Sequence, residues 1–371
     1  MTGLYVHIPF CKSKCGYCDF NSFANFDEHI APYFSALISE AQTWTNRECG
    51  RKFDTLYFGG GTPSYINPKL LGETVVRLLT IFDFAKDTDV TVECNPGTID
   101  FEGFKILKDS GVNRLSIGLQ SANNDVLKKL GRIHTIEDFE RCFDAARRVG
   151  FVNISLDLMY GLPDMTMEDW EYSLNRAIAF NPEHISTYAL KIEEGTPFSK
   201  MELNLPDDDL CADMYEKSVE ILEEQGFKRY EISNFAKYGY ESRHNTKYWR
   251  LTDYLGIGAG AYSCLDGKRF SNYCGLAEYI EAVEKTKTAV CETEYISLSA
   301  QMSEFVFLGL RCTEGISVLE FKEKFGENIT EVFAVPIKKY CDLGFMEVEN
   351  GRLRFTNKGF FVSNTILADF V

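Results

Sequence analysis

The sequence predicts an α/β protein whose core is a partial (β/α)6 TIM-type barrel, followed by a smaller, mostly helical C-terminal domain. Two observations predict the barrel. Apolar runs rich in β-branched and aromatic residues alternate with amphipathic stretches up to residue 190, as parallel strands with right-handed crossovers require. Polar and glycine residues gather directly after these runs, at the edge where barrel loops build a site. The loss of this alternation after Ser299 predicts the second domain.

Six apolar runs are the predicted strands, and six units favour a partial barrel over a closed eight-stranded one. The runs are LYVHI (4–8), TLYFG (55–59), VTVEC (90–94), RLSIGL (114–119), NISLDLMYG (153–161) and HISTYAL (184–190). Stretches with apolar residues at helical spacing lie between them and are predicted helices. These helices cover residues 29–44, 70–82, 101–111, 135–150 and 167–180.

The rest of the chain is organised differently. Residues 191–295 are less regular and contain two further apolar pieces, 228–236 and 254–263. Three predicted helices then precede a short hairpin, an order that resembles a winged-helix unit; they cover 299–311, 317–326 and 330–344, and the hairpin covers 345–355. We therefore expect a barrel domain over 1–235, a connecting region over 236–298 and a helical domain over 299–371. The last domain is slightly acidic, which favours a packing or lid role over DNA reading.

Composition narrows the class of protein. The net charge of −16 argues against nucleic-acid binding, which needs a basic surface to neutralise the phosphates. An anionic membrane surface is an equally poor partner in bulk, although local peripheral association stays open. No apolar run approaches the ~18 residues of a transmembrane helix, and the first residues do not resemble a secretory signal. Nine of the twelve cysteines are scattered without paired spacing, as in a reducing, cytoplasmic setting.

The first motif is a cysteine cluster near the start of the chain. Cys11, Cys15 and Cys18 have the spacing C-x₃-C-x₂-C, and Gly16 permits a tight backbone between the last two. Three thiolates on one short loop can cap one face of a 4Fe–4S cluster and leave the fourth iron open. A zinc site would need a fourth protein ligand. The sequence therefore predicts a 4Fe–4S cluster with an outside ligand.

The second motif is YFGGGTPS, residues 57 to 64. Successive glycines after a strand let backbone groups approach a ligand closely. The stretch is neither a Walker loop nor G-x-G-x-x-G. A structural turn and a backbone cradle for an ammonium group are the two interpretations, and the neighbouring open iron favours the cradle.

These motifs together resemble the radical S-adenosylmethionine (SAM) superfamily. More closely, YVHIPFC, YFGGGTPS, VECNP, SIGLQS, LGRIHT and DLMYGLPDMT resemble the oxygen-independent coproporphyrinogen III oxidase family over almost the whole chain. The resemblance implies a radical SAM core in which SAM ligates the open iron, and a reduced cluster that passes an electron into SAM. It leaves the catalytic residues unassigned.

The resemblance also implies two groups of ligand-binding residues. The positions that match the SAM site are Tyr5, Gly60, Gly61, Thr62 and Glu93. The positions that match a second pocket in the same mouth are Gln120, Arg132, Asp157 and Ala189. A buried polar network that holds strand ends together is the alternative for this second group. Tyr17, inside the cysteine loop, is expected to stack on adenine.

Three features make the chain resemble the HemW branch of haem chaperones within this family. Phe20 stands where the oxidase branch has a further cysteine, and that branch's longer N-terminal arm is missing. Residues 244–249 read HNTKYW, which matches the H-N-x-x-Y-W signature of the HemW branch. His244 is then expected to ligate haem iron, with Tyr248 and Trp249 packed on the macrocycle. A packed aromatic corner with a satisfied histidine is the alternative.

The expected function is therefore that of a cytoplasmic haem chaperone. It would bind a 4Fe–4S cluster, SAM and haem, and deliver haem to a respiratory haem protein. The alternative is an oxygen-independent coproporphyrinogen III oxidase, which converts propionate side chains to vinyl groups. Either function implies a reductant such as flavodoxin or ferredoxin. Enzymatic activity and oligomeric state stay open.

Overall fold

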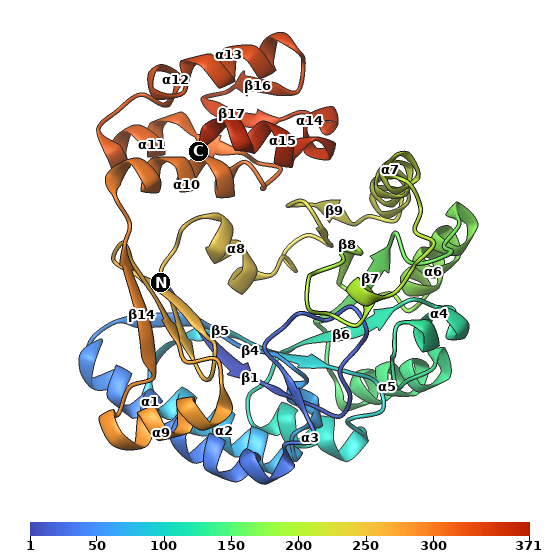
Figure 1. Cartoon of the computed structure of the whole chain (residues 1–371), viewed down its shortest axis with the longest axis vertical. Coiled ribbons are helices and arrows are strands. Elements are labelled where there is room, and N and C mark those ends of the chain that lie inside the picture. Colours follow the sequence, from blue (N-terminus) through green and yellow to red (C-terminus); the bar gives the residue numbers. More distant parts are fainter.

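The structure is a computed structural model that describes residues 1–371, and it confirms a partial barrel with a helical C-terminal domain (Figure 1). Twelve strands form one curved sheet in the order β14-β13-β12-β11-β1-β4-β5-β6-β7-β8-β10-β9. The sheet does not close. Figure 1 shows helices along its outer side, with α8 and the C-terminal domain on the concave side.

All six predicted strands are present and pair in parallel in chain order. Their bounds are β1 Thr2–Ile8, β4 Lys52–Gly60, β5 Asp83–Cys94, β6 Arg114–Gln120, β7 Ile154–Tyr160 and β8 His184–Ala189. A seventh parallel strand, β11 (Tyr254–Ile257), lies on the other side of β1. It comes from the predicted connecting region, so most of that region is continuous with the barrel sheet.

Short strands extend both edges of the sheet in antiparallel fashion. They are β9 Lys228–Arg229, β10 Asn234–Ala236, β12 Tyr262–Leu265, β13 Lys268–Asn272 and β14 Val290–Tyr295. A separate pair, β2 Phe10–Cys11 and β3 Phe23–Ala24, brackets the cysteine loop.

The predicted helices of the barrel are confirmed as α1 Ile30–Arg47, α2 Pro68–Ile81, α3 Phe101–Asp109, α5 Ile136–Val149 and α6 Met167–Ala179. Four more accompany them: α4 Asn124–Lys129, α7 Asp208–Glu224, α8 Arg243–Trp249 and α9 Leu276–Thr286. Helix α5 begins at a capping box of Thr135 with Asp138 and ends at Gly150, whose φ of 99° is left-handed. These residues satisfy backbone groups that a helix end leaves free. No helix of the chain is both long and apolar enough to cross a membrane.

Side chains of the barrel strands alternate between an apolar outer face and a polar interior. On β6, Leu115, Ile117 and Leu119 belong to the core beneath the helices, whereas Arg114 and Ser116 line the interior. The alternation follows from the period of two in a strand. The interior is thus a polar binding space, in contrast to the apolar layers that fill a closed barrel.

The C-terminal domain has its own core and a small sheet. Its helices are α10 Leu298–Gly309, α11 Val318–Phe325, α12 Ile329–Val332, α13 Ala334–Asp342, α14 Asn357–Phe361 and α15 Ser363–Leu367, and its strands are β15 Ile316–Ser317, β16 Met346–Glu349 and β17 Arg352–Phe355. The predicted hairpin is confirmed as β16 and β17. The predicted helix over 330–344 is divided at Phe333, because Pro336 has no N–H to donate to Val332 and its ring crowds that carbonyl.

The two parts of the molecule meet along a narrow seam. Glu231 and Cys312 form a β-bridge, and Arg229 Nη2 donates to Asn357 Oδ1 (2.9 Å). The second core begins with Phe305, and the predicted boundaries at 235 and 298 both stay predictions.

Candidate functional site

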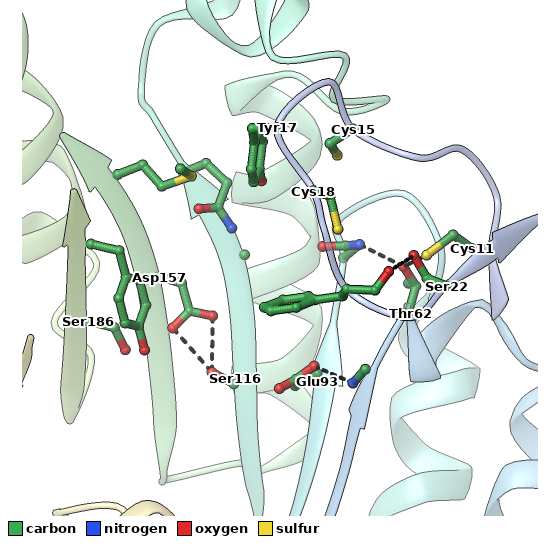
Figure 2. Close-up of a pocket in the computed structure, with 18 of the residues that line it drawn as sticks. Cys11, Cys15, Tyr17, Cys18, Ser22, Thr62, Glu93, Ser116, Asp157 and Ser186 are labelled. Atoms are coloured by element: carbon green, nitrogen blue, oxygen red, sulfur yellow. Dashed lines mark hydrogen bonds between the residues drawn. The ribbon is translucent and has the colours of Figure 1, made fainter. Parts of the chain in front are cut away.

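One pocket of about 370 Å³ brings most of the predicted site residues together (Figure 2). Figure 2 shows the three cysteines on one side of the pocket and Asp157 on the opposite side. The predicted residues that line it are Cys11, Cys15, Tyr17, Cys18, Gly60, Gly61, Thr62, Glu93, Gln120, Arg132, Asp157 and Ala189. Four predicted residues do not line it: Tyr5, His244, Tyr248 and Trp249.

The cysteine loop is held in place by distant segments. The N–H of Gly16 donates to Leu130 O (3.0 Å), and the N–H of Phe198 donates to Gly16 O (2.9 Å). The Phe198 ring occupies the place of a Cβ on Gly16, so this position requires glycine. At the far end of the loop, His7 Nε2 donates to Asn21 O (2.8 Å).

The three thiols suit a cluster of several irons. All are free, and burial raises the pKa of Cys11 and of Cys18, so their thiolates need a nearby positive charge. No three His, Cys, Asp or Glu side chains of the chain converge as a single-ion site requires. Thiolates on a cuboidal cluster bind separate irons and need not converge on one point. The donor set therefore fits a cluster held by three cysteines.

The glycine turn after β4 forms a cradle beside a buried carboxyl group. Gly60 has a φ of 111°, and a Cβ there would meet the His7 ring at 2.5 Å. A Cβ on Gly61 would meet backbone of the neighbouring β2 strand at 2.8 Å. The N–H of Gly60 donates to Glu93 Oε2 (3.2 Å), and Tyr57 Oη donates to Oε1 (2.8 Å). The turn therefore has no room for side chains, and its backbone can contact a ligand directly.

Burial raises the pKa of Glu93 to about 7, although the hydrogen bond from Tyr57 lowers it. The carboxyl group thus changes charge near neutral pH. Ammonium or hydroxyl groups of a ligand would stabilise its ionised form.

Arg132 connects the cysteine loop with the second side of the pocket. Its Nη2 donates to Asn95 Oδ1 (2.6 Å) and to Gly118 O (2.9 Å), and its Nη1 lies 3.8 Å from Cys15 Sγ. Gln120 ends β6 with a φ of 66°, a left-handed conformation that is uncommon for a residue other than Gly, Asn or Asp. Arg132 thus ties the cluster loop to the ends of β5 and β6.

Asp157 faces the cysteines from β7 (Figure 2). Ser116 Oγ donates to its Oδ2 (3.2 Å). Burial raises the pKa of Asp157, while Ser186, Ser116 and Arg114 act to lower it. The second side of the pocket therefore offers a carboxyl group among hydroxyls, beside Ala189 at the end of β8.

The H-N-x-x-Y-W residues form α8, which packs against β4. His244 is 2% exposed; its Nδ1 lies 2.8 Å from Thr55 Oγ1 and its Nε2 lies 2.9 Å from Tyr248 Oη. Its ring stacks on Tyr57 with the centroids 5.0 Å apart. Burial lowers the pKa of His244 to about 3, so the ring is neutral. Both ring nitrogens are engaged in hydrogen bonds. In this structure the motif is therefore the packed aromatic corner with a satisfied histidine, which is one of the two interpretations of its sequence.

Tyr5 and Trp249 lie on either side of this corner. Tyr5 Oη donates to His7 Nδ1 (3.0 Å), and its ring lies 6.2 Å from that of His244. Trp249 faces the C-terminal domain, where the Arg311 guanidinium lies 5.6 Å from its ring centroid. The motif therefore links the barrel interior to the second domain.

Sequence reasoning missed a set of pocket residues that lie deeper in the barrel. They are Arg114, Ser116, Ser155, His184, Ser186 and Asn245. A signal for three of them exists in RLSIGLQ and NISLDL, where every second residue is polar or glycine. A parallel strand buried on both faces is apolar throughout, so this alternation indicates an inner face that lines a cavity.

Comparisons with known proteins find relatives that match the whole chain. The family model described as "Radical SAM superfamily" matches residues 5–177, and that of the "HemN C-terminal domain" matches residues 296–362. A "Heme chaperone HemW" of Bacillus subtilis is 36% identical, with 100% of this chain and 99% of that protein covered. One of Lactococcus lactis is also 36% identical, with 99% and 96% covered.

A solved structure is also similar in fold over the whole chain. It is described as "Coproporphyrinogen III oxidase (HemN) from Escherichia coli is a Radical SAM enzyme" and is 25% identical to this chain. The TM-score is 0.88, with 100% of this chain and 89% of that structure covered.

Proposed function

Because the chain belongs to the HemW family of haem chaperones in the radical SAM superfamily, as its motifs predict, we propose that it binds a 4Fe–4S cluster, SAM and haem, and delivers haem to a respiratory haem protein. One observation carries the proposal: three free cysteines, a glycine turn and a buried carboxyl group surround a single pocket.

The pocket residues divide into three groups by what they would bind. Cys11, Cys15 and Cys18 would hold the cluster, which supplies an electron to SAM when bound. The turn Gly60–Thr62 would receive the methionyl group, Glu93 would accept hydrogen bonds from SAM, and Tyr17 would stack on adenine. The second group of predicted residues, Gln120, Arg132, Asp157 and Ala189, would position a further ligand beside it.

Haem binding is assigned to the motif on α8, with His244 as the proposed iron ligand and Tyr248 and Trp249 against the macrocycle. The His244 ring must first leave Thr55 and Tyr248, since both of its nitrogens are engaged. Haem binding through His244 therefore requires its ring to give up at least one of these two hydrogen bonds.

The proposed partners follow from this function. They are a haem-accepting respiratory protein and a reductant such as flavodoxin or ferredoxin, in the cytoplasm. Nucleic acid is not a proposed partner, because the net charge is −16.

The second candidate is oxidative decarboxylation of coproporphyrinogen III. The structural likeness to the E. coli coproporphyrinogen III oxidase over the full chain favours keeping it as an alternative. Its substrate carries the propionate side chains that such an enzyme converts.

Anaerobic reconstitution of the full chain, followed by parallel assays of haem uptake and coproporphyrinogen turnover with SAM, separates the two candidates. We expect stoichiometric haem uptake, transfer to an apo haem protein and no turnover. The variant Cys15→Ala should lose the cluster absorbance, and Cys291→Ala, at an exposed cysteine outside the pocket, is its control. Turnover without haem uptake would replace the chaperone with the oxidase.

The SAM cradle has a matched pair of glycine variants. Gly60→Ala forces a Cβ against His7, whereas Gly97 has a φ of 79° and nothing within 4 Å of a Cβ. Both variants carry the cost of a left-handed alanine, about 1 kcal/mol, but only Gly60→Ala should also weaken SAM binding, by tenfold or more, roughly 1.4 kcal/mol. Equal SAM affinity in both variants, measured by calorimetry, would remove the turn from the SAM site.

A further inference from the structure

Arg114 is a buried cation without a partner. It begins β6 and is 2% exposed, which places it among the largest fully buried side chains of the chain. Its guanidinium makes no ion pair and no hydrogen bond within the protein, and its Nε is a buried atom without a partner. Buried charges are normally paired because the loss of hydration is otherwise uncompensated.

The carboxyl groups around Arg114 are committed to other donors. Asp89, Glu93 and Asp157 all feel its charge, which lowers the pKa of each against the effect of burial. Glu93 accepts hydrogen bonds from Tyr57 and from the glycine turn, and Asp157 accepts from Ser116. The five N–H donors of the guanidinium therefore stay available.

Arg114 lines the same pocket as the cysteines, and so does Asn245 of α8. The backbone N–H of Asn245 donates to Ser242 Oγ (3.3 Å) at the start of α8, and its side-chain amide makes no hydrogen bond within the protein. A guanidinium and an amide that face one cavity are a donor set for a planar anion, which an arginine can bind through two parallel hydrogen bonds.

We propose that Arg114 and Asn245 form a carboxylate-binding site on the floor of the pocket. Arg114 and Gln120 stand at opposite ends of β6, so their backbones are about 20 Å apart. The site formed by Arg114 and Asn245 is therefore separate from any site at the cysteine loop that holds a carboxylate. It would bind a second carboxylate group. A haem propionate and the carboxylate of an amino-acid ligand share this chemistry. The choice of haem as a probe rests on the proposed function, whereas the site itself does not.

The experiment compares haem, haem dimethyl ester and SAM as ligands of the reconstituted full chain. Wild-type protein should bind haem at least about tenfold more tightly than the diester, because esterification removes the negative charge. Arg114→Gln should weaken haem binding about tenfold to hundredfold, as loss of a hydrogen bond to a charged group does, and leave the diester unchanged. Arg114→Lys keeps the charge and should restore part of the affinity. Arg141→Gln, at an exposed arginine on α5 outside the pocket, is the control.

Each outcome of these measurements supports or overturns the proposed carboxylate-binding site. Loss of haem affinity with unchanged diester affinity assigns the site to a propionate. Loss of a second equivalent of bound SAM, with an unchanged ratio of haem to diester affinity, assigns the site to an amino-acid carboxylate. Equal weakening of haem and diester would show a purely structural arginine, and no change in any ligand would also overturn the proposal. If wild-type protein binds no haem, the chaperone function fails, and the SAM measurement alone decides the site.

Discussion

Glu93 is the residue that should make ligand binding depend on pH. Burial raises its pKa to about 7, so the carboxyl group is largely protonated at pH 6 and ionised at pH 8. In the proposed SAM site the ionised form would accept hydrogen bonds from SAM, and we expect SAM affinity to rise about tenfold between these values. Glu93→Gln should flatten the profile, measured by anaerobic calorimetry.

Glu40 is the natural control for this prediction. It is fully buried, its pKa is raised to about 7 by burial, and its partners are Tyr279, Asn272 and Gly258, outside the pocket. A raised carboxyl pKa adds stability that is complete below the ordinary pKa of 4.5 and is lost as pH rises through 7. Both Gln variants should therefore reduce the pH dependence of stability, but only Glu93→Gln should change that of SAM binding. An unaltered SAM profile in Glu93→Gln would contradict the assignment.

At the scale of one element, α8 packs against β4 in a closed state in which the His244 ring cannot bind a ligand. Its His244 ring is held by Thr55 and Tyr248, and haem ligation requires this ring to be free. Tyr248→Phe removes one of the two hydrogen bonds, which costs about 1 kcal/mol in the closed state. We expect lower thermal stability and a roughly fivefold higher haem affinity, while His244→Ala should lose the axial-ligand signature in the haem spectrum.

Tyr254→Phe is the control for the Tyr248→Phe variant. Tyr254 packs edge-on against Tyr248, with ring centroids 4.7 Å apart, and does not contact His244 through a hydrogen bond. It should leave haem affinity unchanged. An unaltered haem spectrum in His244→Ala, with equal stability loss in Tyr248→Phe, would make His244 an anchor of α8 only.

The elements that could be predicted from the sequence are those with a local pattern. The six strands alternate with amphipathic helices, and the cysteine loop and glycine turn are contiguous motifs. Strand β11 could not be placed, because it joins β1 from about 250 residues away and local pattern carries no information about distant pairing. For the same reason the sequence identified the residues of α8 but not the engagement of His244 with Thr55. Arg114 was missed because it lies at the start of a strand, away from the carboxyl-end edge.

At the scale of the whole molecule, two separate cores predict two units of folding. The C-terminal core includes Phe305 and Val306 from α10 and Leu310 directly after it, and stands apart from the barrel core. We expect a chain of residues 299–371 to melt cooperatively on its own, followed by circular dichroism. A chain of residues 313–371, which lacks α10, should not. Identical non-cooperative behaviour of both chains would contradict the division at residue 298.

His7 has a consequence for how the site assembles. One face of its ring fills the space beneath Gly60, and its Nε2 holds Asn21 at the exit of the cysteine loop. The loop and the glycine turn thus share a single rigid support, and ordering one restricts the other. We expect binding at the two places to be thermodynamically linked: a cluster held in the loop would raise the affinity of the turn for its ligand, and by reciprocity that ligand would make the cluster harder to lose.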